Sequence, residues 1–282
     1  MAENQRYLFK YYYIGKEKFH GSQRQKDFST IEGCLIDMLM KKKYIENVKS
    51  SGIEFASRTD RLVSAKGAAF SFLTSKKPIL MEINSDLPKE IGIWGFAKVP
   101  KDFLSRFNAI FRYYKYVVPV PLSILGKNSE IDLKLMEKAC KELEGQHDFI
   151  NFSKWEKGEK KTIRTIDSVK MAIDDDFIIF DFKSKAYLRQ QIRRMVKKIL
   201  ELGKGVISFD DFQKLFDSSQ RTSYQPADPS GLILWDIDFG KRVHFEIDLK
   251  SIERMEKFFF DQKFKFKFKH QLFNILQQHN LS

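Results

Sequence analysis

The sequence is poor in cysteine and proline and contains no long apolar run. It has 2 cysteines and 7 prolines among 282 residues. Because Cys34 and Cys140 lie far apart and form no Cys-x-x-Cys pair, a disulfide framework and a zinc knuckle are excluded. No window reaches the roughly 18 apolar residues of a membrane-spanning helix, and no apolar segment follows the first residues. We therefore expect a soluble cytoplasmic protein with no membrane contact.

Metal-ligand patterns are also missing. The 5 histidines are scattered along the chain, without His-x-His or His-x-x-x-His spacing. Such spacings supply the ligands of many protein metal sites. We predict that the chain binds neither a metal ion nor a small-molecule cofactor.

Positive charge and aromatic residues are abundant. The 50 lysines and arginines outnumber the 37 acidic residues, which gives a net charge of +13, and 14% of the residues are aromatic. With 43% hydrophobic residues the chain can fill a core, so disorder is excluded as its main state. A basic protein attracts polyanions, of which nucleic acid is the commonest in cells. A soluble basic protein without such a partner is the alternative.

The order of predicted elements repeats along the chain. In the first part, strands at 6–14, 52–57, 66–73 and 91–99 alternate with helices at 30–43 and 85–91. After a polar joint at 100–105, strands at 111–118, 162–172, 177–182 and 232–237 alternate with helices at 132–143, 187–202 and 209–216. We predict an α+β fold of two ferredoxin-like halves, 1–105 and 106–240. Their antiparallel sheets join around a central basic cleft, with helices on the outer face.

Residues 241–282 form a carboxy-terminal extension outside the two halves. Within it, Lys263–Lys269 alternates lysine and phenylalanine with period two. This pattern predicts a strand whose phenylalanines face the core, in preference to a platform for stacked bases. The extension could add to the sheet, contact RNA or strengthen a dimer.

Much of the net charge is concentrated between residues 182 and 204, which hold eight basic residues and one acid. On a helix, Arg189, Arg193 and Lys197 lie along one margin of the apolar stripe. A solvated amphipathic helix explains this pattern without a ligand. An arginine beside a buried face nevertheless needs a partner, and a carboxylate or a phosphate would serve.

A single carboxylate, Asp60, lies in the turn Arg58–Arg61 between two predicted strands. The two flanking cations favour its ionised form. Most turn aspartates are structural. Asp60, however, is accompanied by the basic helix and by the aromatic strand Phe111–Tyr116. No second carboxylate and no Ser/His pair is near it in the sequence, and a lone ionised aspartate suits a nucleophilic role.

The segment Phe55–Ala65 closely resembles the Gly-Arg-Thr-Asp signature of the TruA family of tRNA pseudouridine synthases. The Val63-Ser64-Ala65 part is similar to the archaeal and eukaryotic branch. Six more segments resemble family motifs in the family's order, over about residues 7–237: Tyr13–Gln25, Thr30–Gly33, Arg112–Tyr116, Gly145–Phe149, Ala186–Arg193 and Pro229–Leu232.

The resemblance implies a reaction and a set of site residues. Asp60 would be the nucleophile, paired with Arg193, and Tyr116 would stack on the uracil. Arg58 would bind phosphate or fill the gap that the extruded base leaves. The substrate-binding residues would be Arg24, Gln25, Arg61, Arg112, Arg189 and Lys197.

The resemblance also implies partners. The substrate would be uridine in the anticodon stem-loop of tRNA, at one or more of the tRNA positions 38, 39 and 40, and the enzyme would be a homodimer without a cofactor. Ser57 and Leu62 stand where the family has glycine, and leucine at a positive φ costs on the order of 1 kcal/mol. A catalytically silent RNA-binding protein on the same fold is therefore the alternative. A basic ribosome-associated protein has only the net charge in its favour.

Overall fold

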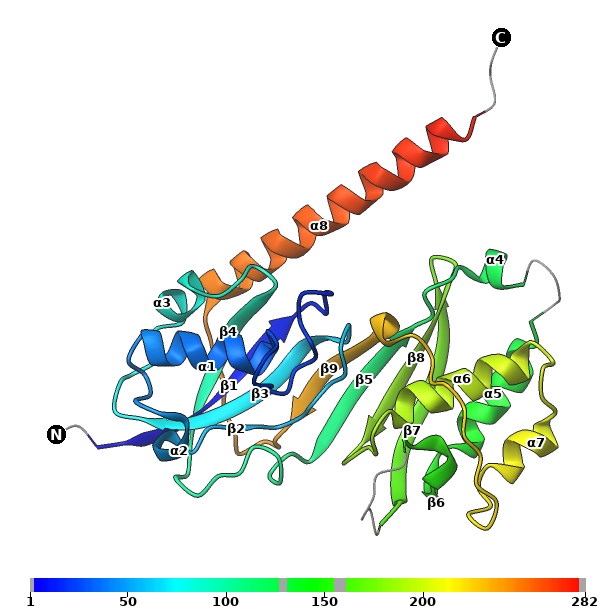
Figure 1. Ribbon diagram of the computed structural model, residues 1–282, viewed down its shortest axis with the longest axis horizontal. Coiled ribbons are helices and arrows are strands. Elements are labelled where there is room, and N and C mark those ends of the chain that lie inside the picture. Colours follow the sequence, from blue (N-terminus) through cyan, green and yellow to red (C-terminus); the bar gives the residue numbers. More distant parts are fainter. Residues whose placement is uncertain (1–2, 127–130, 155–160, 279–282) are drawn as a thin grey trace.

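The computed structural model describes residues 3–126, 131–154 and 161–278 (Figure 1). The fold is mixed α+β, with one large sheet and the helices mostly outside it, as predicted. The strands are β1 Gln5–Tyr13, β2 Glu54–Phe55, β3 Ser64–Thr74, β4 Ile91–Val99, β5 Phe111–Val117, β6 Gly145–Asp148, β7 Ile163–Asp174, β8 Phe177–Ser184, β9 Leu232–Asp238 and β10 Glu246–Ile247. The helices are α1 Ile31–Lys41, α2 Val48–Ser51, α3 Leu80–Ser85, α4 Leu122–Leu125, α5 Leu133–Glu142, α6 Gln191–Gly203, α7 Phe209–Lys214 and α8 Leu249–Leu276, with 3₁₀ turns at Ile150–Phe152 and Pro229–Gly231.

The sheet runs continuously in the order β10-β4-β1-β3-β9-β5-β8-β7-β6, and β2 pairs with β3. Its two halves join where β3 pairs in parallel with β9, with Ser64 opposite Ile233 and Ala65 opposite Leu234. The other strand pairs of the sheet are antiparallel. The predicted edge-to-edge junction therefore exists. It places the loop before β3 beside elements of the second half.

The first half has an aromatic core under α1. Thr30 caps α1 by accepting a hydrogen bond from the Gly33 backbone N–H at 3.1 Å, so the helix begins next to the predicted start at residue 30. Leu35 of α1 is fully buried and belongs to the same core as Phe9 and Phe70, whose rings stack with centroids 5.2 Å apart.

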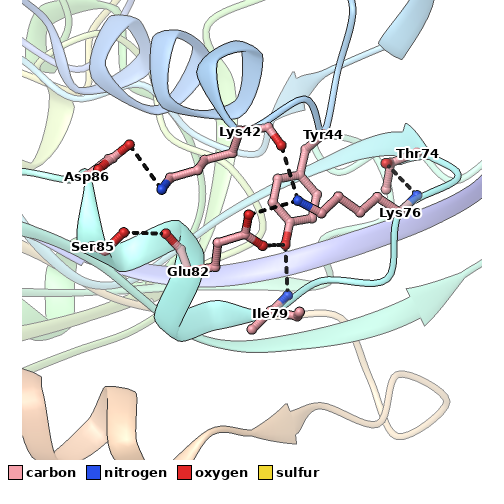
Figure 2. Close-up of polar contacts among 8 residues, drawn as sticks. All are labelled: Lys42, Tyr44, Thr74, Lys76, Ile79, Glu82, Ser85 and Asp86. Atoms are coloured by element: carbon pink, nitrogen blue, oxygen red, sulfur yellow. Dashed lines mark hydrogen bonds and ion pairs between the residues drawn. The ribbon is translucent and has the colours of Figure 1, made fainter.

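A polar cluster ties the end of α1 to α3 (Figure 2). The Tyr44 hydroxyl donates to Glu82 at 2.9 Å and accepts from the Ile79 N–H at 3.0 Å, while Lys76 pairs with Glu82 at 2.8 Å.

The predicted helix at 85–91 is wrong, because α3 ends at Ser85. Pro88 cannot donate a helical hydrogen bond and disfavours helical backbone at the residue before it.

In the second half α5 and α6 pack together beside β7 and β8 (Figure 1). The apolar stripe of α6 is buried, as the spacing predicted. The helix starts at Gln191 and not at residue 187, because Gln190 has a left-handed backbone with φ of 60°. Strand β6 was not predicted from the sequence.

The prediction of a strand at Lys263–Lys269 is wrong, because this segment is part of the 28-residue helix α8. The first part of α8 packs on the body, through the buried Ser251 and Met255 and through Phe258 and Phe259, whose rings contact Tyr12, and the rest extends away from it (Figure 1). The phenylalanines at 264, 266 and 268 are 67%, 63% and 62% exposed. A lone strand leaves its backbone groups unpaired, whereas a helix satisfies them within the segment. No described helix, α8 included, is long and apolar enough to cross a membrane.

Candidate active site

Asp60 lies in the loop between β2 and β3, and its partner comes from the other half of the sheet. Arg193, near the start of α6, donates from Nη1 to Asp60 Oδ2 at 2.5 Å. The Arg193 side chain is 9% exposed and that of Asp60 is 31% exposed. The predicted pair of residues, 133 positions apart in sequence, is therefore formed. The carboxylate keeps access to solvent while its cation is buried.

Ala227 binds both the side chain and the backbone of Arg193. Its Nε donates to the carbonyl of Ala227 at 2.8 Å, and the Ala227 N–H donates to the Arg193 carbonyl at 3.0 Å. Because the guanidinium is fixed by two acceptors, it holds the Asp60 carboxylate in one orientation. An unpaired arginine at this depth would be strongly destabilising.

The Asp60 loop is braced by the opening strand and the loop that follows it. Thr59 hydrogen-bonds the Tyr13 hydroxyl at 2.7 Å, and its N–H donates to Ser22 Oγ at 2.8 Å. Gly15 lies so close that a Cβ there would approach the Leu62 backbone to 2.2 Å. Only glycine fits at this position.

The two departures from the family signature have defined places in the loop. Leu62 has φ of 70°, so the left-handed backbone expected of a glycine is present with a leucine side chain. The Ser57 hydroxyl accepts from Arg112 Nε at 2.9 Å. Ser57 therefore adds a contact that glycine cannot make, and Leu62 retains strain on the order of 1 kcal/mol beside the site.

The two tyrosines of β5 near the site are buried. Burial raises the pKa of the Tyr114 hydroxyl, and Asp60 adds to that rise. Burial also raises the pKa of Tyr116, whose hydroxyl donates to the carbonyl of Asp228 at 2.9 Å. Tyr116 is 1% exposed, so a base can stack on its ring only after the segment at Asp228 moves. The stacking role stays a prediction.

Four of the other predicted site residues have exposed side chains around the loop: Arg24, Gln25, Arg58 and Arg61. Arg61 donates to the carbonyl of Glu17 at 3.0 Å, and Gln25 donates to that of His20 at 2.7 Å. Their exposed positions leave them accessible to a large ligand.

The other three predicted substrate-binding residues, Arg112, Arg189 and Lys197, lie in different surroundings. Arg112 is buried and donates to the carbonyls of Ala56 and Lys185, so in this structure it holds the Asp60 loop to the strand β5. Lys197 forms an ion pair with Glu201 at 3.2 Å, and Arg189 is exposed just before α6. The contacts of these three residues with RNA stay predictions.

Comparison with known proteins identifies the family. A family model described as tRNA pseudouridine synthase matches residues 139–240. The tRNA pseudouridine synthase A of Methanosarcina mazei is 35% identical over 252 residues, which cover 88% of this chain and 90% of that protein. The chain belongs to the tRNA pseudouridine synthase A family. The Archaeoglobus fulgidus protein of the same name is 34% identical over 278 residues, 98% of this chain and 99% of its own length.

The resemblance to synthases of the archaeal branch is thus confirmed. The segment that the family model matches contains α6 with Arg193, whereas Asp60 lies outside it. In the described ranges, no group of three or more His, Cys, Asp or Glu side chains is placed to hold a metal ion.

Several supporting residues of this synthase-family site were not found from the sequence. Tyr13 and Ser22 hold Thr59, and Ala227 holds Arg193. Tyr13 and Ser22 lie inside the opening motif, which was the available signal. Ala227 acts through its backbone N–H and carbonyl, so the residue type at this position gave no signal.

Proposed function

We propose that this chain isomerises uridine to pseudouridine in tRNA with Asp60 as the nucleophile. The observation that supports it most is the 2.5 Å pair between Asp60 and Arg193. It joins a partly exposed carboxylate to a buried cation from the other half of the sheet. A buried arginine that is itself held by a second acceptor fixes the orientation of the carboxylate, as an attack on the substrate requires.

The proposed reaction breaks the bond from uracil N1 to the ribose C1′, turns the base and forms a bond from C5 to C1′. The C5 hydrogen leaves as a proton and N1 takes up one proton, so the product is an isomer of the substrate and no oxidant or reductant is needed. Asp60 assists by attacking either C6 of the base or C1′ of the sugar, and it is released when the product forms. Arg193 holds the carboxylate in one orientation.

The proposed substrate is the anticodon arm of tRNA, from which the target uridine is extruded. The exposed Arg24, Arg58 and Arg61 support this assignment, because phosphate contacts position an RNA without reading its sequence. Action at one or more of the positions 38, 39 and 40, assembly as a homodimer and location in the cytoplasm are further parts of the proposal.

The test is to incubate unmodified tRNA transcript with the protein and with its Asp60→Ala variant, and to map pseudouridine by carbodiimide-dependent reverse-transcription stops. We expect stops in the anticodon arm with the wild type alone, and tRNA binding within about threefold in both, a small change in binding free energy. Tight binding without stops in either sample would contradict the proposal and favour the silent RNA-binding protein.

A further inference from the structure

A cavity of about 670 Å³ lies next to the site, on the part of the second half that α6 and the segment before β9 form. Arg193 belongs to its lining as well as to the pair with Asp60. The volume is within the range of pockets that hold small ligands. The cavity and the candidate active site therefore share a side chain.

The described residues that line the cavity include four cations and no acid: Lys154, Arg193, Arg194 and Arg221. Arg193 is balanced by Asp60, so the other three charges are in excess at the lining itself. Three cations around one hollow repel one another unless an anion enters. The lining therefore has the electrostatic character of an anion site.

Arg194 is the most informative of the three. It is 7% exposed, and its Nε has no hydrogen-bond partner among the described residues. Its guanidinium lies 5.1 Å from the centre of the Tyr224 ring, which holds it at the cavity. The Nε atom is itself shielded from solvent, so Arg194 contributes to the cavity through the positive charge of its guanidinium, which no described carboxylate of the lining neutralises.

The start of α6 adds a partial positive charge at the cavity. Gln190 and the start of α6 lie at the cavity, and no side chain caps the helix there. The N-terminus of a helix carries a partial positive charge. Ser223 and Thr222 supply hydroxyl groups on the opposite segment of the lining.

We propose that this cavity binds a phosphodiester group of the tRNA, next to the nucleotide at Asp60. Arg194, Arg221 and Lys154 form the subsite, with Arg221 and Lys154 at its exposed rim. The subsite positions the strand, so that Asp60 receives its nucleotide in one register. The inference rests on tRNA as the substrate and does not depend on whether Asp60 attacks.

The first experiment removes the two rim cations, whose exposure makes unfolding no concern. The double variant Lys154→Gln and Arg221→Gln is compared with the control Lys49→Gln and Lys77→Gln, which removes two exposed lysines from the first half. We expect the rim variant to bind tRNA at least about tenfold more weakly, and the slope of log K against log salt to fall by about 1 to 2. Equal effects of the two double variants would overturn the proposal.

The second experiment locates the phosphate. An anticodon stem-loop is made with one neutral methylphosphonate at a time, and its affinity is measured for the Asp60→Ala protein with and without the rim substitutions. Using this inactive background keeps the result separate from the proposed chemistry. We expect one or two adjacent linkages at which neutralisation weakens the parent about tenfold and the rim variant hardly at all. Additive losses at every linkage, or rim effects on inorganic phosphate binding without any on RNA, would overturn the proposal.

Discussion

Helices α6 and α8 are both rich in lysine and arginine, but one is built into the site and the other extends into solvent. The 13 residues of α6 include four cations, two of which, Arg193 and Arg194, are buried. The 28 residues of α8 include seven cations, and only Ser251 and Met255 of this helix are buried. Composition therefore does not decide which basic helix contributes to the site.

The difference lies in the spacing of the apolar residues. In α6 they recur at helical spacing, so one stripe enters the core and carries the adjacent arginines with it. In the alternating segment of α8, phenylalanines are distributed around the helix and no single face can be covered. Arg193, beside the buried stripe of α6, thereby acquires fixed partners, whereas the lysines at 263–269 of α8 are exposed to solvent.

Between the two helices, the largest expected difference is in activity and comes from Arg193→Ala in α6. Without the guanidinium the Asp60 carboxylate loses its fixed partner, and we expect the single-turnover rate to fall by about 100-fold or more. Lys267→Ala in α8, which also removes one cation, serves as the control and should leave the rate within twofold. Comparable losses in both variants would break the distinction between the two helices.

Core truncation in the two helices should separate them in stability. Met195→Ala in α6 empties a fully buried position and should lower the free energy of unfolding by about 2–5 kcal/mol. Phe266→Ala in α8 removes an exposed ring and should change it by less than about 0.5 kcal/mol. Urea denaturation of both variants measures this. A large loss for Phe266→Ala would mean that α8 is covered in solution.

Substitutions at the starts of the two helices should change the free energy of unfolding by smaller amounts and in opposite directions. Asp248 caps α8 by accepting from the Ser251 N–H at 2.8 Å, so Asp248→Ala should destabilise the protein by about 1 kcal/mol. Gln190 precedes α6 with φ of 60°, so Gln190→Gly should stabilise it by up to about 1 kcal/mol. Thermal unfolding of the two variants should therefore shift in opposite directions, and shifts of one sign would contradict this account.

The smallest effect is expected from removing the exposed part of α8. A chain that ends after Gln262 loses helix that makes no buried contact among the described residues. Its thermal unfolding midpoint should stay within about 2 °C of the full chain, since no core is lost. A chain that ends after Asp248 also loses the buried Ser251 and Met255 and should unfold several degrees lower.

Helices α6 and α8 also differ in how well the sequence predicts them. The pairing of Asp60 with Arg193 was predictable, because a family motif marked each residue and the helical stripe located Arg193 at a buried margin. The tail was not predictable from alternation, since a strand needs a neighbouring strand and the pattern says nothing of whether one is present. The left-handed backbone of Gln190 and the cavity beside it also lay beyond the sequence, because both depend on how distant loops meet.

The most direct test of the central claim follows the atom that the reaction must release. A tRNA transcript with tritium at C5 of its uridines is mixed with excess enzyme, and tritium in water is measured over time. For Asp60→Asn, which keeps size and polarity but removes the charge, the account predicts a rate at least about 1,000-fold below the wild type, with tRNA affinity within threefold. Release by Asp60→Asn within tenfold of the wild type would contradict the role of Asp60 as the nucleophile.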